Sequence, residues 1–196
     1  MPRTTLRELN GLDETLATLD DATLVLIDYQ NTYTTGVMEL DGWEAALESA
    51  AELLVRAREA RTPVIHVIND GGEGTPYDIR AEIGQIHARV APIEGEAVVV
   101  KQVPNGFVDT DLGARVDAAG RKNLVIAGFM THMCVAFTAQ GAFLRGNRPT
   151  VVADASATRA LPLAGAELDA CQVHYSALAT VADLYGTVAM SQKEIV

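Results

Sequence analysis

The sequence has little of what an extracellular, membrane-bound or nucleic-acid-binding protein needs. Only two cysteines, Cys134 and Cys171, occur among its 196 residues, which is too few for a disulfide framework. Basic residues number 15 against 26 acidic ones, and the resulting net charge of −11 repels nucleic acid and anionic membranes. Residues 1–20 contain no apolar segment of the kind that a secretory signal or a transmembrane helix requires. We therefore expect a cytoplasmic protein with reduced thiols and with neither nucleic acid nor membrane as a partner.

Linkers, internal repeats and low-complexity tracts are also absent from the sequence. Its composition, 48% hydrophobic and 21% charged, is that of an ordinary globular domain. Residues 1–196 are therefore predicted to form one domain, in which residues 1–20 are a polar lead-in. No G-x-G-x-x-G motif follows the first apolar run and no acidic residue closes the second, which argues against a nucleotide-binding oxidoreductase.

Short apolar runs alternate with stretches of helical periodicity along the whole chain. The runs predict strands at residues 23–28, 64–68, 97–101, 123–127, 150–153 and 187–190. The periodic stretches predict helices at residues 43–60, 78–89, 109–119, 131–146 and 163–185, and the glycines of residues 69–77 predict a flexible loop. Such alternation with short connections is typical of a parallel sheet covered by helices on both faces.

Three of the predicted strands lead to side chains that carry chemistry. Asp28 closes the first strand, Lys101 closes the third, and Cys134 opens the helix after the fourth. In open parallel sheets, ligands bind outside the carboxyl ends of the strands, so these residues are expected to meet there. The positive end of the helix dipole is expected to favour the thiolate of Cys134.

Each of these three residues also has an ordinary interpretation. Cysteine is often a small buried hydrophobe, an aspartate at a strand end often caps a loop, and a lysine after an apolar run is often solvated. Together, however, an acid, a cation and a thiol at one rim predict acyl transfer, with Asp28 taking the thiol proton and Lys101 stabilising the anion.

The segments around these residues resemble a known family, the isochorismatase-like cysteine hydrolases, which include nicotinamidases and N-carbamoylsarcosine amidases. The resemblance lies in L-V-L-I-D-Y-Q-N around Asp28, V-V-V-K-Q-V-P-N-G-F around Lys101 and A-G-F-M-T-H-M-C-V around Cys134, and it spans residues 24–184. It implies a three-layer α/β/α, Rossmann-like fold with a six-stranded, mainly parallel sheet. It also implies a cis peptide bond just before Met130 and a catalytic triad of Asp28, Lys101 and Cys134.

The same resemblance implies a reaction. Cys134 would attack a carbonyl carbon and form a thioester, while the backbone N–H groups of Met130 and Cys134 hold the oxyanion. A retained thiol suits cleavage of a C–N bond in an amide, ureido or carbamoyl compound better than hydrolysis of a vinyl ether, as in the family's namesake. Two alternatives stay open: vinyl-ether hydrolysis, and a redox-active or non-catalytic thiol protein on the same fold.

The sequence departs from the nicotinamidase pattern of metal ligands. No histidine occurs between Tyr29 and Ala60, and the D-x-H spacing is missing, so neither a metal nor another cofactor is expected. The predicted substrate-binding residues are Gln30, Tyr33, Phe107 and His132. The residues expected to have structural roles are His66 within a strand, His87 and His174 within helices, Asp154 after the fifth strand, and Cys171 in the core. The expected partners are a small-molecule substrate and further copies of the chain, in a dimer or a larger homo-oligomer.

Overall fold

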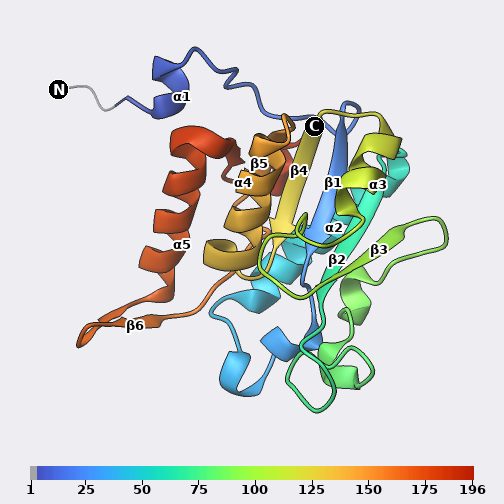
Figure 1. Cartoon of the computed structure of the whole chain (residues 1–196), viewed down its shortest axis with the longest axis vertical. Helices are drawn as coiled ribbons and strands as arrows, with labels where there is room; N and C mark the ends of the chain where they lie inside the picture. The colour runs from blue at the N-terminus through green and yellow to red at the C-terminus, as the bar shows by residue number, and fades with distance from the viewer. Residues whose placement is uncertain (1–3) are drawn as a thin grey trace.

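The computed structural model describes residues 4–196 and has a doubly wound α/β architecture, with a parallel sheet between two layers of helices (Figure 1). The first three residues of the predicted lead-in lie outside the described residues. Six strands pair in the order β3-β2-β1-β4-β5-β8, all parallel. They are β1 (Ala22–Ile27), β2 (Val64–Asn69), β3 (Ala97–Lys101), β4 (Asn123–Gly128), β5 (Arg148–Val152) and β8 (Thr187–Ala189). The predicted fold class is therefore confirmed.

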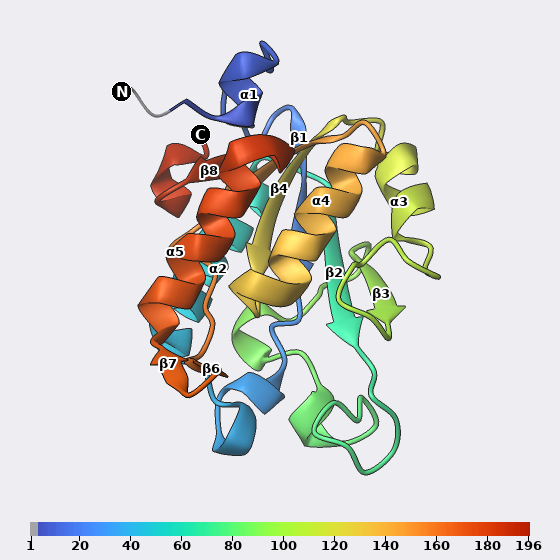
Figure 2. The ribbon, with the colours of Figure 1, turned by 60° about the vertical axis from the view of Figure 1, so that its left-hand side comes forward.

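The central strands are apolar on both faces because helices cover both. In β1, Leu24 and Leu26 pack into one core cluster with α2 (Trp43–Glu59), whereas Val25 and Ile27 pack into a second cluster on the opposite face. This second face is covered by α3 (Leu112–Ala119), α4 (Ala136–Leu144) and α5 (Ala170–Thr180), and Figure 2 shows α4 and α5 side by side in front of the sheet. The alternation of side chains along a strand thus divides the core into two layers.

The lead-in is anchored at the amino-terminal end of the sheet. It contains one helical turn, α1 (Leu6–Leu9), which begins with a capping box between Thr5 and Glu8. The backbone N–H of Leu6 donates to Asp183, and that of Ala17 donates to Thr150 in β5. No helix within residues 4–196 combines the length and the apolar character needed to cross a bilayer.

The predicted helix at residues 78–89 was wrong, and local hydrogen bonding explains why. Residues 78–89 form only two short 3₁₀ turns, Glu82–Gly84 and Ala88–Val90, because the Asp78 carboxylate binds the backbone N–H groups of Gly74 and Arg80 and so stabilises turns instead. His87 accordingly lies at the start of a 3₁₀ turn and not in a helix.

The predicted helix at residues 163–185 begins too early. Residues 161–168 form a hairpin of β6 (Leu161–Leu163) and β7 (Ala166–Leu168), which turns at Ala164 and Gly165 with φ of 49° and 85°. Helix α5 starts only after Asp169, whose carboxylate caps it, and it continues into a π-helical turn at Val181–Tyr185. Cys171 lies in α5 but is exposed, so its predicted place in the core was wrong.

Smaller boundary differences affect two other predicted helices. Helix α3 starts at Leu112, three residues later than expected, after Asp109 adopts a left-handed conformation with φ of 54°. The predicted helix at residues 131–146 divides into a π-helical turn, Thr131–Val135, followed by α4. This division places Cys134 inside the π-helical turn.

Candidate active site

Asp28, Lys101 and Cys134 meet at the carboxyl ends of the strands. The Lys101 Nζ lies 2.7 Å from the Asp28 Oδ2 and 3.3 Å from the Cys134 Sγ. Asp28 is 0% exposed, Lys101 1% and Cys134 7%, so the three groups interact in an environment that is almost free of solvent. The three residues that the sequence predicted to converge are brought together.

The backbone explains how the strands deliver these side chains. Asp28 adopts a left-handed conformation, with φ of 52°, directly after β1, although aspartate rarely adopts it. Gly128 ends β4 with φ of 155°, and a Cβ there would lie 2.1 Å from the carbonyl oxygen of Ile27 in the neighbouring strand. Only glycine permits this close approach of β1 and β4. The peptide bond between Phe129 and Met130 is cis, as the resemblance implied.

Burial determines the protonation of the thiol. It raises the pKa of Cys134 to about 12, and the neighbouring Asp28 carboxylate adds to this effect against the opposing pull of Lys101. The expectation that the helix start would favour a thiolate was therefore wrong, because desolvation and the Asp28 charge raise the pKa of the thiol. At rest Cys134 is a neutral thiol.

The two charged partners respond differently to the same burial. Desolvation raises the pKa of Asp28, with Lys101 opposing the change. For Lys101, burial alone would lower the pKa, but Asp28 and Cys134 outweigh it and raise the pKa above its ordinary value. The Asp28 carboxylate is paired with the Lys101 ammonium and also borders Cys134, so it is placed to take a proton from the thiol.

The two backbone N–H groups expected to bind an oxyanion belong to Met130 and Cys134. No acceptor for the Met130 N–H occurs within residues 4–196. Cys134 lies in the first turn of a helical segment, where backbone N–H groups lack partners from a preceding turn. Binding of an oxyanion by these two groups stays a prediction.

The predicted substrate-binding residues differ in position. Tyr33 is 2% exposed, and its pKa is raised by burial and next by Asp28 and Cys134, which places it at the wall of the site. Phe107 packs against the core cluster that contains Cys134, and the Arg145 guanidinium lies 5.3 Å from its ring centroid. His132 hydrogen-bonds Thr158 and borders a groove between α4, α5 and the hairpin. Substrate binding by these three residues stays a prediction.

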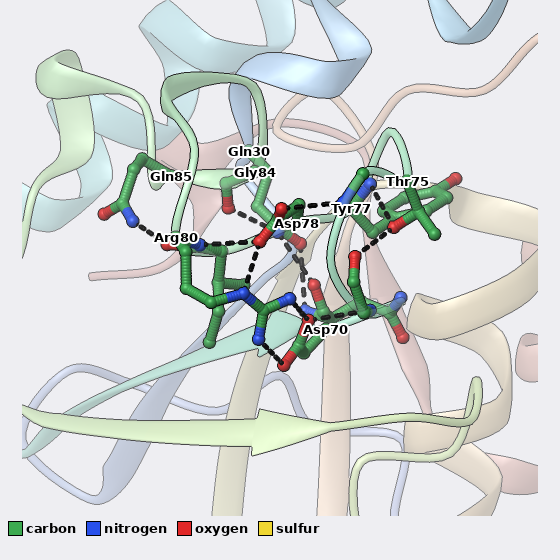
Figure 3. A network of polar contacts seen from close by, with 12 residues as sticks. Gln30, Asp70, Thr75, Tyr77, Asp78, Arg80, Gly84 and Gln85 are labelled. Atoms are coloured by element: carbon green, nitrogen blue, oxygen red, sulfur yellow. Dashed lines mark hydrogen bonds and ion pairs between the residues drawn. The ribbon is translucent and has the colours of Figure 1, made fainter.

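Gln30 lies close to the site, but its side chain is already occupied. It is 0% exposed, and its amide donates to the backbone oxygens of Asn69 (2.9 Å) and Gly84 (2.7 Å) and accepts from the Asn69 N–H (2.9 Å). Figure 3 shows Gln30 reaching across to Gly84. This geometry gives no support to the predicted contact between Gln30 and a substrate.

The loop after β2, expected to be flexible, is braced by a polar network. Arg80 forms ion pairs with Asp70 and Asp78, and Figure 3 shows its guanidinium between them. The loop also carries Tyr77, whose ring centroid lies 5.8 Å from that of Tyr33 and whose pKa is raised by burial and then by the nearby Cys134 and Asp28. Tyr77 could not be placed near the site from the sequence, because its position depends on how the loop folds back.

Arg159, at the end of the segment after β5, is a second residue that the sequence reasoning missed. Its Nε is buried without a hydrogen-bond partner among the described residues. Its charge acts on His132, where burial and then Arg159 lower the pKa, and on Tyr77. A guanidinium so placed is available to an anion that enters beside Tyr77.

The remaining polar residues have structural partners. Asp154 accepts from the Ser191 hydroxyl and the Gln192 N–H, as expected. His66 lies in β2 and contacts Glu96, and His174 contacts Thr131. Within residues 4–196, no group of three or more His, Cys, Asp or Glu side chains is arranged to hold a metal ion.

A doubly wound parallel sheet with a thiol, a carboxylate and an ammonium buried at the carboxyl ends of its strands is the arrangement of a three-layer α/β/α enzyme with a cysteine at its candidate active site. Residues 22–184 match the isochorismatase domain, and the chain belongs to the isochorismatase family of hydrolases. A secreted isochorismatase effector from Verticillium dahliae is 35% identical over 190 residues, covering 96% of this chain and 97% of that protein.

Two further comparisons agree with this placement. The crystal structure of an isochorismatase from Pseudomonas putida covers 100% of both chains with a TM-score of 0.96 and 36% identity. Maleamate amidohydrolase from Pseudomonas putida is 34% identical over 152 residues, which is 66% of this chain and 68% of that protein. Since one relative is secreted, the cytoplasmic location stays a prediction for this chain.

Proposed function

We propose that the protein is a metal-independent cysteine hydrolase that cleaves a C–N bond in a small amide, ureido or carbamoyl compound. The observation that carries this proposal is the buried contact of Lys101 with both Asp28 and Cys134, at 2.7 Å and 3.3 Å. Its likeness to an amidohydrolase and the missing metal donor set support the choice of bond and the absence of a metal.

In the proposed reaction, the proton moves from the Cys134 sulfur to the Asp28 carboxylate as the sulfur bonds to the carbonyl carbon. The carbonyl electron pair moves to oxygen, which the N–H groups of Met130 and Cys134 bind. When the oxyanion collapses, the C–N bond breaks and the nitrogen takes the proton from Asp28. Water then attacks the thioester, Asp28 accepts its proton, and the proton returns to the sulfur as the C–S bond breaks.

The raised pKa of Cys134 favours this sequence over oxidation of the thiol. A peroxide reacts with a thiolate, which is scarce at neutral pH when the pKa is about 12. A hydrolase avoids this difficulty, since its substrate is attacked as Asp28 removes the proton. The redox-active alternative therefore has less support than hydrolysis.

Arg159 indicates the kind of substrate. Its unpartnered Nε and its influence on Tyr77 suit a compound that carries a carboxylate next to the amide. Maleamate, the compound named for one relative, has this chemistry. Arg159→Gln should raise KM for such compounds by about tenfold to a hundredfold, the usual range for a lost hydrogen bond to a charged group, and leave KM for neutral amides unchanged.

The proposal is tested with a panel of maleamate, N-carbamoyl amino acids, ureido acids and neutral carboxamides. We expect ammonia release from at least one and a Cys134 acyl adduct in the intact mass after rapid acid quenching. Metal chelation should leave the rate unchanged. Absence of any adduct or ammonia, together with ready peroxide oxidation of Cys134, would support the redox alternative, and hydrolysis of isochorismate alone would support vinyl-ether cleavage.

The proposed homo-oligomer has a candidate surface on α4 and α5. Neither helix contains a charged residue, while Phe137 and Tyr175 on them are 44% and 53% exposed. For a chain with a net charge of −11, an uncharged face allows two copies to meet without repulsion. Phe137→Glu should reduce the molar mass measured by light scattering, whereas Val37→Glu, at an exposed position outside α4 and α5, should not.

A further inference from the structure

The Lys101 ammonium has a third partner beside the two reactive groups. An ammonium carries three N–H donors, and those of Lys101 face the Asp28 Oδ2, the Cys134 Sγ and the side-chain oxygen of Asn69, the last at 3.3 Å. Since Lys101 is 1% exposed, bulk water is not available to replace a lost acceptor. Asn69 therefore completes the coordination of the buried cation.

Strand pairing and a side-chain clamp fix Asn69 in this place. Asn69 and Lys101 are direct register partners on β2 and β3, so their side chains leave the sheet together. The Gln30 amide binds both the N–H and the C=O of Asn69, at 2.9 Å each, and ties them to Gly84 in the braced loop (Figure 3). With its backbone held in this way, Asn69 is free to direct its side chain at Lys101.

The proposed reaction changes the other two partners of Lys101. When the Cys134 proton moves to Asp28, the carboxylate becomes neutral and the negative charge appears on sulfur. An ammonium held only by these two groups would shift with the charge. The Asn69 amide does not titrate, so it offers the same acceptor at every step of the reaction.

We propose that Asn69, held by Gln30, is the positioning residue that keeps the Lys101 ammonium between Asp28 and Cys134 throughout turnover. This inference rests on the proposed function for its catalytic consequence, but the contact with Lys101 does not. It also gives Gln30 a role. This glutamine, two residues after Asp28, holds the backbone at the end of β2 in place and does not bind the substrate.

The test replaces Asn69 by leucine, which has a similar shape and no acceptor, and by aspartate, which keeps one. For Asn69→Leu we expect kcat to fall by about tenfold to a hundredfold with KM unchanged, and the alkaline limb of the pH–rate profile to move to lower pH, because the unpaired ammonium loses its proton more easily. Asn69→Asp should keep the alkaline limb at or above its original position. Asn31→Ala, which removes a loop contact to Glu82 without touching Lys101, should leave the pH profile unchanged.

A second readout does not depend on turnover. The lysines are Lys101, Lys122 and Lys193, so the side-chain carbon signals of labelled lysine are assigned with two arginine variants and followed against pH. The titratable groups facing Lys101 are Asp28 and Cys134, with Tyr33 and Tyr77 beyond them. Because their ionisation also shifts the Lys101 signal, the spectra of the variant and of the original protein are compared at equal pH.

The two readouts separate the possible failures. We expect the Lys101 signal of Asn69→Leu to titrate at lower pH than that of the original protein. If neither this titration nor the pH profile changes, the positioning role is wrong even when amides are hydrolysed. If the titration shifts but no amide is ever hydrolysed, the positioning role stands and the proposed function fails.

Discussion

Asp28→Asn should slow turnover and, at the same time, make the Cys134 thiol more reactive toward an alkylating agent. Burial and the Asp28 charge raise the pKa of Cys134 far above pH 8, so the thiol is mostly protonated and the original protein depends on Asp28 to remove the proton. Without that carboxylate, turnover should fall by about 10²- to 10⁴-fold, the usual contribution of general acid–base catalysis. The thiol itself, however, should become more acidic, because a neighbouring negative charge is gone and Lys101 remains.

The size of the second effect follows from the loss of a neighbouring like charge. Removing such a charge lowers a pKa by about one to three units, so alkylation of Cys134 by iodoacetamide at pH 8 should become at least about tenfold faster. The rates are measured by intact mass, alongside ammonia release from the best substrate of the panel. Asp21→Asn, an exposed carboxylate before the other end of β1, is the matched control and should change neither rate.

Two results would refute this reasoning. Unchanged turnover in Asp28→Asn would remove Asp28 as the carrier of the proton. Alkylation that stays as slow as in the original protein would show that the Asp28 charge does not raise the pKa of Cys134. Faster alkylation together with lost turnover is the combination that the buried triad requires.

Three further variants test other parts of the structure. Cys134→Ala should keep the unfolding temperature within a few degrees and abolish turnover, and an active alanine variant would exclude covalent attack. Glu96→Gln should lower the free energy of unfolding at pH 7 by about 2 kcal/mol, since Arg58 and His66 lose a buried anionic partner. Burial alone would raise the pKa of Glu96, but these partners lower it from 4.5 to about 2. The stabilisation of the fold by ionised Glu96 is therefore present above pH 4.5 and is lost as the pH falls toward 2. In urea titrations, the free energy of unfolding of Glu96→Gln should not show this loss at low pH. Gly128→Ala should destabilise the fold by about 3 kcal/mol in the same titrations, because the new Cβ would collide with the backbone of β1, and a loss below about 0.5 kcal/mol would contradict the close approach of the strands.

The helices that were predicted wrongly show where local pattern stops being informative. The hairpin before α5 and the turns at residues 78–89 have apolar residues at spacings that also suit a helix. Side-chain caps decide between the alternatives, Asp169 by starting α5 and Asp78 by binding turn N–H groups. Capping depends on the conformation that each aspartate adopts, so periodicity alone did not find these boundaries.

By itself the sequence determined the parallel sheet and the convergence of Asp28, Lys101 and Cys134. Apolar runs that alternate with helical stretches are local patterns typical of parallel strands, and the carboxyl ends of such strands lie at one rim. Only the tertiary structure decided that burial raises the pKa of the thiol, that Asn69 completes the coordination of Lys101, and that Tyr77 lies near the thiol with Arg159 close to Tyr77. These features depend on burial and on contacts between distant segments. The free energy of a charge is set by everything that surrounds it, and no stretch of sequence contains that information.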